Sequence, residues 1–544
     1  MMMNVKIASY AFLMGLALFG HAAGQDTFKY AGCADVTRAN FTKVTIVDKT
    51  KNADLSEPVR FAIANNGDIY FAERSGGLKV AKTNGSIVKI GSVPSFPVVE
   101  KLKISGNNEL GFTGLALDPA FETNHWVYVD YQPTSPDVMN ISRYTLNGDV
   151  LDLASEKIML SFPMQKDYCC HTGGDMKFDA KGDLWISIGN NTRNPSNVSD
   201  PKGYVDESIP SADDQGHAAN TNDYRGKILR IHPTADGKYT VPAGNFKDYF
   251  ASMYDAADLA KIKPEIYTMG HRSDYTISVD NLKNLLAWGD IGPDEAFETE
   301  EFNITAKPGF MGWPYFAGAA GHAHYALRLN KDPAAPVNTS VNNTGVQKLP
   351  PAQPATIGYL KSAAITGPIY RYSSAQTSTK KVPPHFDGKW FIGDFNAGYI
   401  HIVTLDDAGT KVVARNSLMT GLIRPLQITI GPDGVLYTLE YANNYFTTDG
   451  ATRIARWDYT GPACVSTSLA DKVGKTGSIK AGMLLNLGID SRRNIAVPAG
   501  THGFGLYDLQ GKLAWQYQIT TEGAKNVAIP STLGNGLYRV KFDL

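Results

Sequence analysis

The stretch HFDGKWFIGDFNAGYIHIV, residues 385–403, contains two short runs in which large apolar residues alternate with small or polar ones. Asp387 and Gly388 precede the first run, and Asn396, Ala397 and Gly398 separate it from the second. Alternation with a period of two, bounded by Gly, Asp and Asn, is typical of β-hairpins. The stretch therefore predicts two antiparallel strands joined by a tight turn.

The same unit recurs along the chain, often with a further strand pattern before or after it. The other copies are residues 65–80, 118–133, 179–190, 280–293 and 431–444. Hairpin units repeated at roughly 40–50 residues indicate the blades of a propeller, in which each sheet buries its faces against its neighbours. The repeats predict an all-β fold, a six-bladed β-propeller within residues 25–462. A pair of stacked β-sandwiches is the alternative.

Residues 1–24 are predicted to be a secretory signal peptide. Lys6 precedes an apolar run over residues 7–19, and small residues follow at positions 22–24. The run is too short for a spanning helix, although an uncleaved anchor is the alternative. No later segment is apolar for long enough to span a membrane, so we expect a secreted, periplasmic or cell-surface protein. Lys and Arg number 52 against 53 Asp and Glu, a balance that gives no electrostatic signature of nucleic-acid binding.

The pattern changes near residue 467, and residues 467–544 are predicted to form a small β-sandwich. The segments FGLYDLQGKLAWQ (504–516) and LGNGLYRVKF (533–542) resemble the C-terminal sorting modules of secreted Bacteroidetes and Fibrobacter proteins. This resemblance implies a contact with secretion machinery. A module that only adds stability or contacts carbohydrate is the alternative.

The segment CCHTGGDMKFDAKGDLWISIGN, residues 169–190, is the first candidate for chemistry. His171 is expected just before a blade strand, and an imidazole can take a proton near neutral pH. The glycines at 173 and 174 let a ligand or another backbone approach closely. A histidine that only satisfies buried polar groups is the alternative.

Over residues 55–460 the chain resembles the soluble quinoprotein glucose/sorbosone dehydrogenases, also called aldose sugar dehydrogenases. The segments that carry the resemblance occur in family order: GDIYFAERSGGLKV, NELGFTGLALDPAFETNHWVYVDY, CCHTGGDMKFDAKGDLWISIGN, NTNDYRGKILRI, EIYTMGHRSDYTISVD, GDIGPDEAFETEEFN and FMGWPYFAG. Each segment is weak alone, but the ordered set is specific. The resemblance implies a six-bladed propeller that uses pyrroloquinoline quinone (PQQ) and Ca²⁺.

The resemblance also implies roles for individual residues. His171 matches the base that removes the proton of the anomeric hydroxyl while hydride passes to the quinone. Glu109 matches a residue that touches the cofactor, and Arg272 matches an arginine that neutralises a quinone oxygen or carboxylate, where a fixed cation stabilises developing negative charge. Arg424 lies near a family arginine that binds a cofactor carboxylate. Both arginines could instead form ordinary ion pairs between blades.

Gly292 and Pro293 match the residues whose backbone carbonyls hold the catalytic calcium. Oxygen ligands suit Ca²⁺, and the bound ion can polarise the quinone as a Lewis acid. The Gly-Pro dipeptide is also a common turn signal in any protein.

Three expected cofactor-binding positions depart from the family pattern. Ser273 stands where many members have Asn, Asn190 replaces a common acidic residue, and Asn396 occupies a position where some members have a basic residue. The loss of that cation would weaken the hold on a tricarboxylate.

The chain has four cysteines, which allow three complete pairings. Adjacent Cα atoms lie about 3.8 Å apart, below the ~4.4–6.8 Å usual for disulfides, so a Cys169–Cys170 bond would be a strained eight-membered ring. Such a ring could form a stiff platform beside a planar cofactor, as in the distantly related quinoprotein alcohol dehydrogenases. A second bond, Cys33–Cys464, would join the two ends of the propeller. Reduced thiols or other pairings are the alternatives.

These observations predict an exported PQQ- and Ca²⁺-dependent sugar dehydrogenase that oxidises an aldose to the lactone. Its electrons would go to an external acceptor, since the chain has no C-x-x-C-H haem motif. A calcium-dependent lactonase and a non-catalytic carbohydrate-binding propeller are the alternatives. The departures at Asn190, Ser273 and Asn396 favour the last of these.

Overall fold

The computed structural model describes residues 36–94, 109–167, 170–193, 203–293, 299–319, 332–359 and 362–462, together with short segments outside this range. Those segments are residues 30–31, 465–466, 484–489, 494–496, 502–507, 512–518, 526–528, 530 and 536–543. Residues 36–461 belong to one compact unit, and residues 30–31 belong with the residues from Pro462 onward to a second. The predicted signal peptide lies outside the described residues, as do Cys33, Cys169 and Cys464.

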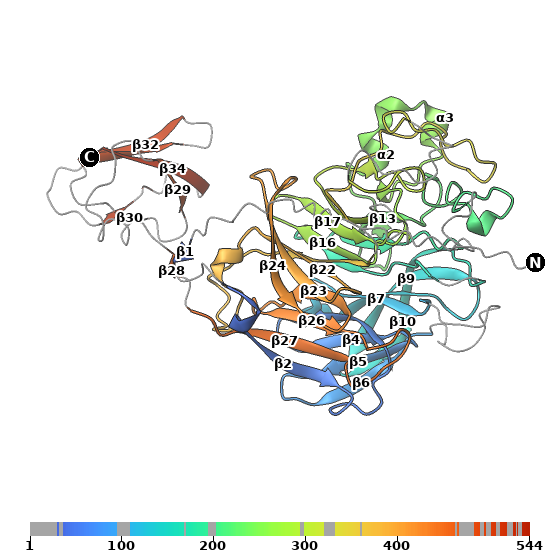
Figure 1. Ribbon diagram of the computed structural model, residues 1–544, viewed down its shortest axis with the longest axis horizontal. Coiled ribbons are helices and arrows are strands. Elements are labelled where there is room, and N and C mark those ends of the chain that lie inside the picture. The colour runs from blue at the N-terminus through green and yellow to red at the C-terminus, as the bar shows by residue number, and fades with distance from the viewer. Residues whose placement is uncertain are drawn as a thin grey trace, which may run out of the picture. The chain divides into compact units, whose positions relative to one another are not determined.

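The first unit is a six-bladed β-propeller, as the hairpin repeats predicted (Figure 1). The first three blades consist of β3 (Pro58–Ile63), β4 (Ile69–Glu73), β5 (Gly77–Ala81) and β6 (Ile87–Ser92); β7 (Phe112–Leu117), β8 (Trp126–Tyr131), β9 (Val138–Asn147) and β10 (Val150–Pro163); and β11 (Met176–Phe178), β12 (Leu184–Ile188), β13 (Lys227–Pro233) and β15 (Ile266–Met269). Within each blade, strands that are neighbours in this order run antiparallel.

The last three blades follow the same plan. They consist of β16 (Thr276–Asp280), β17 (Leu285–Asp290), β18 (Glu300–Thr305) and β20 (Ile357–Tyr359); β21 (Ala364–Ile369), β22 (Trp390–Asp394), β23 (Tyr399–Leu405) and β24 (Val412–Thr420); and β25 (Pro425–Ile430), β26 (Leu436–Glu440), β27 (Arg453–Tyr459) and β2 (Phe41–Asp48).

Strand β2 closes the ring. It comes from the start of the unit, yet it pairs antiparallel with β27 from the end, with Phe41 opposite Tyr459 and Asp48 opposite Arg453. Figure 1 shows blue β2 beside orange β27. The first strands of consecutive blades contact one another around the axis, and β25 contacts β3 to complete the circle. A closed ring leaves no first or last sheet face exposed.

Apolar side chains fill the spaces between neighbouring blades. Between the last blade and the first, Val47, Phe61, Phe71, Leu439 and Ile454 form one buried cluster. Between the first and second blades, another cluster includes residues 78, 80, 112, 127 and 129. Alternation along each strand therefore serves two interfaces, because each sheet buries both of its faces.

Long insertions occur in the third and fourth blades. Those of the third blade contain β14 (Tyr239–Thr240), α2 (Phe246–Tyr249), α3 (Ala256–Leu259) and the 3₁₀ turns η2 (Pro210–Ala212) and η3 (Ala251–Met253). The connection between β18 and β20 in the fourth blade contains β19 (Gly309–Phe310), which pairs parallel with β15 of the third blade. The remaining short helices are α1 (Phe121–Asn124), η1 (Arg38–Asn40) and η4 (Pro384–Phe386). None of the described helices is long and apolar enough to cross a membrane.

The second unit is also built of strands. It has a four-stranded sheet ordered β29-β34-β31-β32 and two pairs, β30-β33 and β1-β28. The strands are β1 (Tyr30–Ala31), β28 (Val465–Ser466), β29 (Leu484–Ile489), β30 (Asn494–Ala496), β31 (Gly503–Tyr507), β32 (Leu513–Gln518), β33 (Asn526–Ala528) and β34 (Gly536–Asp543). The sorting role of this unit stays a prediction.

Candidate active site

The predicted site residues all lie at the same end of their blades. Glu109, His171, Arg272 and Arg424 lie just before the first strand of a blade, whereas Asn190 lies just after a second strand. Gly292, Pro293 and Asn396 also follow second strands. Because the first and second strands of a blade are antiparallel, all these connections emerge at the same end of the propeller. The fold thus gathers residues from five blades on one face.

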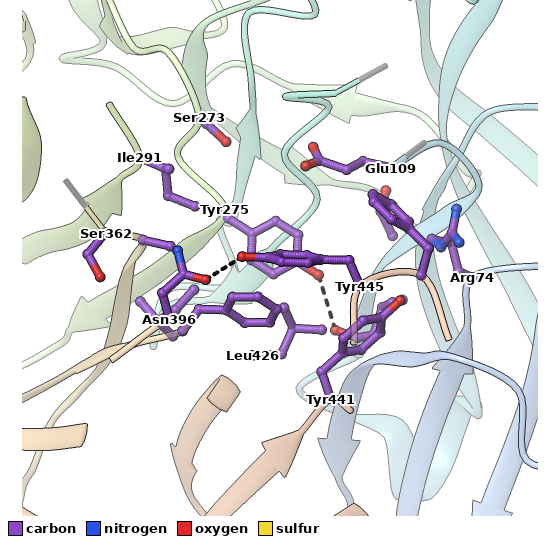
Figure 2. A pocket seen from close by; sticks show the side chains of 16 residues that line it. Arg74, Glu109, Ser273, Tyr275, Ile291, Ser362, Asn396, Leu426, Tyr441 and Tyr445 are labelled. Atoms are coloured by element: carbon purple, nitrogen blue, oxygen red, sulfur yellow. Dashed lines mark hydrogen bonds between the residues drawn. The ribbon is translucent and has the colours of Figure 1, made fainter. Parts of the chain in front are cut away.

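At this end lies a cavity of about 240 Å³, close to the lower end of the ~300–1,000 Å³ typical of small-molecule sites. The residues that line it are Val59, Arg74, Glu109, Thr113, Ser273, Tyr275, Ile291, Ser362, Ala363, Ile365, Phe395, Asn396, Leu426, Tyr441, Tyr445 and Phe446. Figure 2 shows Glu109 and Arg74 on one side, Asn396 and Ser362 on the other, and Tyr445 between them. The wall is mainly aromatic and aliphatic, which suits a flat ligand.

His171 is buried and is not among the residues that line the cavity, but it contacts Glu109, which is. Its backbone N–H donates to the Glu109 carboxylate at 2.6 Å, and its ring Nδ1 lies 3.0 Å from the Asn190 side-chain oxygen. Burial lowers the pKa of His171 well below its usual value, and the nearby Arg272 charge lowers it further, while the Asn190 bond opposes the shift. His171 is therefore a neutral imidazole near neutral pH. Its Nε2 makes no hydrogen bond within the described part of the chain.

Tyr204 contacts both Arg272 and His171. The guanidinium donates to the Tyr204 hydroxyl from Nη2 at 2.8 Å, and its central carbon lies 5.2 Å from the Tyr204 ring centre. The His171 and Tyr204 rings are 6.4 Å apart between centroids. Arg272 also donates from Nη1 to the backbone oxygen of Ile291, a residue of the cavity wall, at 2.6 Å. The predicted base and the predicted cation thus belong to one cluster.

Asp290 holds the turn that carries Arg272. Its carboxylate accepts from the backbone N–H of Ser273 at 2.7 Å and from that of Arg272 at 3.2 Å. Ser273 lines the cavity, so the shorter side chain at this departure still faces the site.

The predicted calcium ligands Gly292 and Pro293 follow directly after Ile291. The Pro293 carbonyl accepts from the Thr299 hydroxyl at 2.7 Å, which leaves this oxygen one further lone pair. A Cβ on Gly292 would lie 2.2 Å from the Thr299 carbonyl oxygen, so the chain packs too closely there for any side chain. Among the described residues, no group of three or more His, Cys, Asp or Glu side chains could hold a metal. A calcium ion here would depend on backbone carbonyls, as the resemblance implies.

The opposite wall combines an amide, a phenol and a cation. The Tyr445 hydroxyl donates to the Asn396 side-chain oxygen, and the Arg424 guanidinium stacks on the Tyr445 ring, 4.0 Å from its centre. Nη1 of Arg424 is enclosed and makes no hydrogen bond within the described residues. An unpaired donor on a permanent cation next to an aromatic cavity fits a flat anionic ligand such as PQQ. Asn396 lines the cavity but supplies no charge.

Arg74, in the first of the resembling segments, is neutralised by a residue that the sequence did not single out. Its Nη2 donates to both carboxylate oxygens of Glu57 at 2.7 Å, and the Tyr441 hydroxyl donates to the same carboxylate. The adjacent Glu73 instead pairs with Lys79 at 2.8 Å. Arg74 therefore supplies less free charge to the cavity than Arg424 does.

Backbone strain also gathers at this face. His171 has φ 58°, Cys170 has φ 99° and Arg424 has φ 46°, all in the left-handed region that residues other than Gly rarely adopt. Such conformations persist where the surrounding structure enforces them, commonly at functional sites. Cys170 is disulfide-bonded, but its partner lies outside the described residues. Both predicted disulfide pairings stay predictions.

Sequence reasoning missed several contributors besides Glu57 and Asp290, among them Tyr204, Asp214 and Tyr445. Tyr204 and Asp214 come from the polar stretch 194–223, which lies outside the hairpin units, and Tyr445 follows the last of those units. The only available signal was the aromatic and acidic content of those loops. Their contacts with distant blades are a tertiary property.

Comparison with known proteins identifies the family of this chain. The family model for glucose/sorbosone dehydrogenases matches residues 55–445. Quinoprotein glucose dehydrogenase B of Acinetobacter calcoaceticus is 25% identical over 308 residues, 54% of this chain, but the match spans only 57% of that relative. An uncharacterised Synechocystis protein is 23% identical over 435 residues, 78% of this chain and 91% of its own length.

Solved structures share the fold. The apo form of the soluble aldose sugar dehydrogenase of Escherichia coli aligns with a TM-score of 0.53 and 18% identity, covering 77% of this chain and 99% of that one. The PQQ-bound form of the Streptomyces coelicolor aldose sugar dehydrogenase aligns with a TM-score of 0.50 and 18% identity, covering 77% and 98%. Since the family model spans well over half of the chain, this protein belongs to the glucose/sorbosone dehydrogenase family.

Proposed function

We propose that this protein is an exported dehydrogenase that oxidises an aldose at its anomeric carbon to the lactone, with PQQ and Ca²⁺ as cofactors. One observation carries the proposal: a buried, neutral His171 with an uncommitted Nε2 lies in one cluster with Arg272, beside an aromatic cavity. Family membership supports the same reaction class.

Each residue then has a definite task. Nε2 of His171 accepts the proton of the anomeric hydroxyl, while Nδ1 keeps its bond to Asn190. Arg272, held by Tyr204 and the Ile291 carbonyl, places a fixed positive charge where negative charge develops. When bound, PQQ supplies the hydride acceptor and Ca²⁺ the Lewis acid, and the electrons leave to an external acceptor.

The cofactors would be held by different parts of the site. Arg424 offers its unpaired Nη1 to a carboxylate, and Phe395 and Tyr445 offer flat surfaces to a planar ring system. The backbone carbonyls of Gly292 and Pro293 would hold the calcium ion. Asn396 contributes a polar wall without charge, so we expect weaker cofactor binding than a lysine there would give.

The test is sugar-dependent dye reduction by the purified chain loaded with PQQ and Ca²⁺. We expect turnover with at least one aldose, and we expect His171→Gln to lower kcat by about 10²–10⁴-fold, the usual contribution of a general base. His232→Gln is the matched control, because that half-exposed histidine bonds Asp183 in the third blade. Absence of turnover across a broad panel of aldoses would sink the proposal.

No specific observation at the site favours the lactonase or the non-catalytic propeller. A lactonase with a central calcium held by carboxylates would need acidic side chains placed together to hold the ion, and the described residues contain no group of three or more such side chains so placed. A non-catalytic carbohydrate-binding propeller would not need a buried histidine with a free Nε2. Glycan binding that persists unchanged in His171→Gln, without any oxidation, would favour that alternative.

A further inference from the structure

A second carboxylate stands behind His171 and reaches it through an amide. The Asn190 side-chain oxygen lies 3.0 Å from Nδ1 of His171, and the Asn190 side-chain nitrogen donates to Oδ2 of Asp214 at 2.7 Å. Asn190 and Asp214 are 0% exposed and His171 is 6% exposed, so water does not compete for these bonds. Asn190 occupies the position where the resemblance led us to expect an acid. In this chain the carboxylate is that of Asp214, which bonds Asn190 and not His171 itself.

The neighbours of Asn190 determine which way its amide faces. Oδ2 of Asp214 also accepts from the Trp313 indole N–H at 2.6 Å, and the Asn190 oxygen accepts from the backbone N–H of Thr192 at 3.3 Å. Indole and backbone N–H groups can only donate. A flipped Asn190 would place its oxygen against the carboxylate oxygen and its NH₂ against the Thr192 N–H. The observed orientation is therefore strongly favoured.

This orientation in turn determines the tautomer of His171. The Asn190 oxygen can only accept, so Nδ1 of the neutral imidazole carries the proton and Nε2 carries the lone pair. Burial raises the pKa of Asp214 to about 7, against the three side-chain bonds that it accepts. A proton taken up there would sit on Oδ1, which faces the Thr192 hydroxyl, because two donors already hold Oδ2. Both protonation states of Asp214 thus hold Asn190 the same way.

We propose that Asp214 is a positioning residue that acts through Asn190, forming a carboxylate–amide–imidazole chain that keeps Nε2 of His171 free as the base. The proposal rests on the dehydrogenase function argued above. An amide between the carboxylate and the ring gives the orientation of a direct acid–histidine pair without placing a negative charge against the imidazole. A direct carboxylate would favour the imidazolium and make a poorer proton acceptor at low pH.

The first test reads the His171 tautomer in the full chain without cofactor, from long-range ¹H–¹⁵N correlations of ¹⁵N-histidine-labelled protein. The His171 signal is the one that disappears in His171→Gln. We expect the Nδ1–H tautomer in the wild type and a mixture with Nε2–H in Asp214→Ala, since the Asn190 amide then loses its anchor. Asp213→Ala is the matched control: Asp213 is equally buried, but it bonds Ser340 and Asn342 instead.

An Nε2–H tautomer in the wild type, or an unchanged tautomer in Asp214→Ala, would overturn the proposal. This test needs no turnover, so it stands even if no aldose is oxidised, and the two proposals can fail separately. In the loaded enzyme we expect Asp214→Ala to lower kcat by about 10–100-fold, as losses of supporting hydrogen bonds commonly do, with KM nearly unchanged.

If Asp214→Ala does not fold, the double variant Asn190→Asp with Asp214→Asn tests the proposal instead. It places the carboxylate directly on His171 and the amide behind it. The other groups that face His171, namely Glu109, Arg272 and Tyr204, stay in place. We expect the Nδ1–H tautomer to persist while the ring protonates at a higher pH than in the wild type. If the His171 ring protonates at the same pH in this variant as in the wild type, the proposed carboxylate–amide–imidazole arrangement is refuted.

Discussion

At the scale of single residues, the neutrality of His171 depends on where it is buried. Burial and the Arg272 charge hold its pKa well below its usual value, and the Asn190 bond only partly opposes them. A histidine so placed remains a base at pH values where an exposed one would be protonated.

The pH dependence of turnover follows from the lowered pKa of His171. Because the pKa of His171 is lowered, we expect kcat/KM of the loaded enzyme to stay level as pH falls through about 6.5, where an ordinary histidine protonates. Activity should drop only at clearly lower pH. The unfolded chain takes up a proton near pH 6.5 that the native state does not, so the stability linked to His171 declines as pH falls below that value. An acidic limb centred at or above pH 6.5 would contradict the assignment of His171.

Gly189 is a second residue-scale constraint on the site. The backbone around His171 runs against it, so a Cβ at position 189 would lie 2.2 Å from the His171 carbonyl oxygen. We expect Gly189→Ala to displace His171, to lower kcat and to cost about 1–3 kcal/mol of unfolding free energy, the usual effect of overpacking. Gly450→Ala is the control, since a Cβ there meets nothing within 4 Å. Equal stability of the two variants in denaturant titrations would argue against this packing.

At the scale of elements, the hairpin pattern identified the strands well because alternation reports burial directly. In 385–403, the two predicted strands are β22 and β23, joined by a turn at Phe395–Gly398. The pattern did not identify the closing strand β2, because its burial is mostly intermediate and its partner β27 lies some 400 positions away along the printed sequence.

The role of β2 can be measured through Val47, which is 0% exposed in the cluster between the last and first blades. We expect Val47→Ala to lower the unfolding free energy by about 1.5–3 kcal/mol, the contribution of a fully buried valine. Thr42→Ala, at an exposed position of the same strand, should have a much smaller effect. If both variants unfold at the same denaturant concentration, β2 does not carry the closure described here.

At the scale of the whole molecule, the candidate site belongs to one of the two compact units. Its described residues lie between Glu57 and Tyr445–Phe446, all within the unit that ends at Gly461. A chain ending at Gly461 should therefore keep the kcat and KM of the full chain towards any aldose that the full chain oxidises. A large loss of kcat in the shortened chain, with unchanged cofactor binding, would show that the second unit contributes to the site.

The sequence alone determined the repeat number, the all-β class, the family and the positions of His171 and Arg272, because alternation and short motifs are local properties. Only the tertiary structure decided how those residues are held. Tyr204 contacts both His171 and Arg272, Asp214 orients Asn190 from 24 positions away, and the Tyr445 ring stacks on Arg424. The physical reason is that ring closure brings loops from different blades to one end. Which side chains meet there depends on long-range packing that no local pattern records.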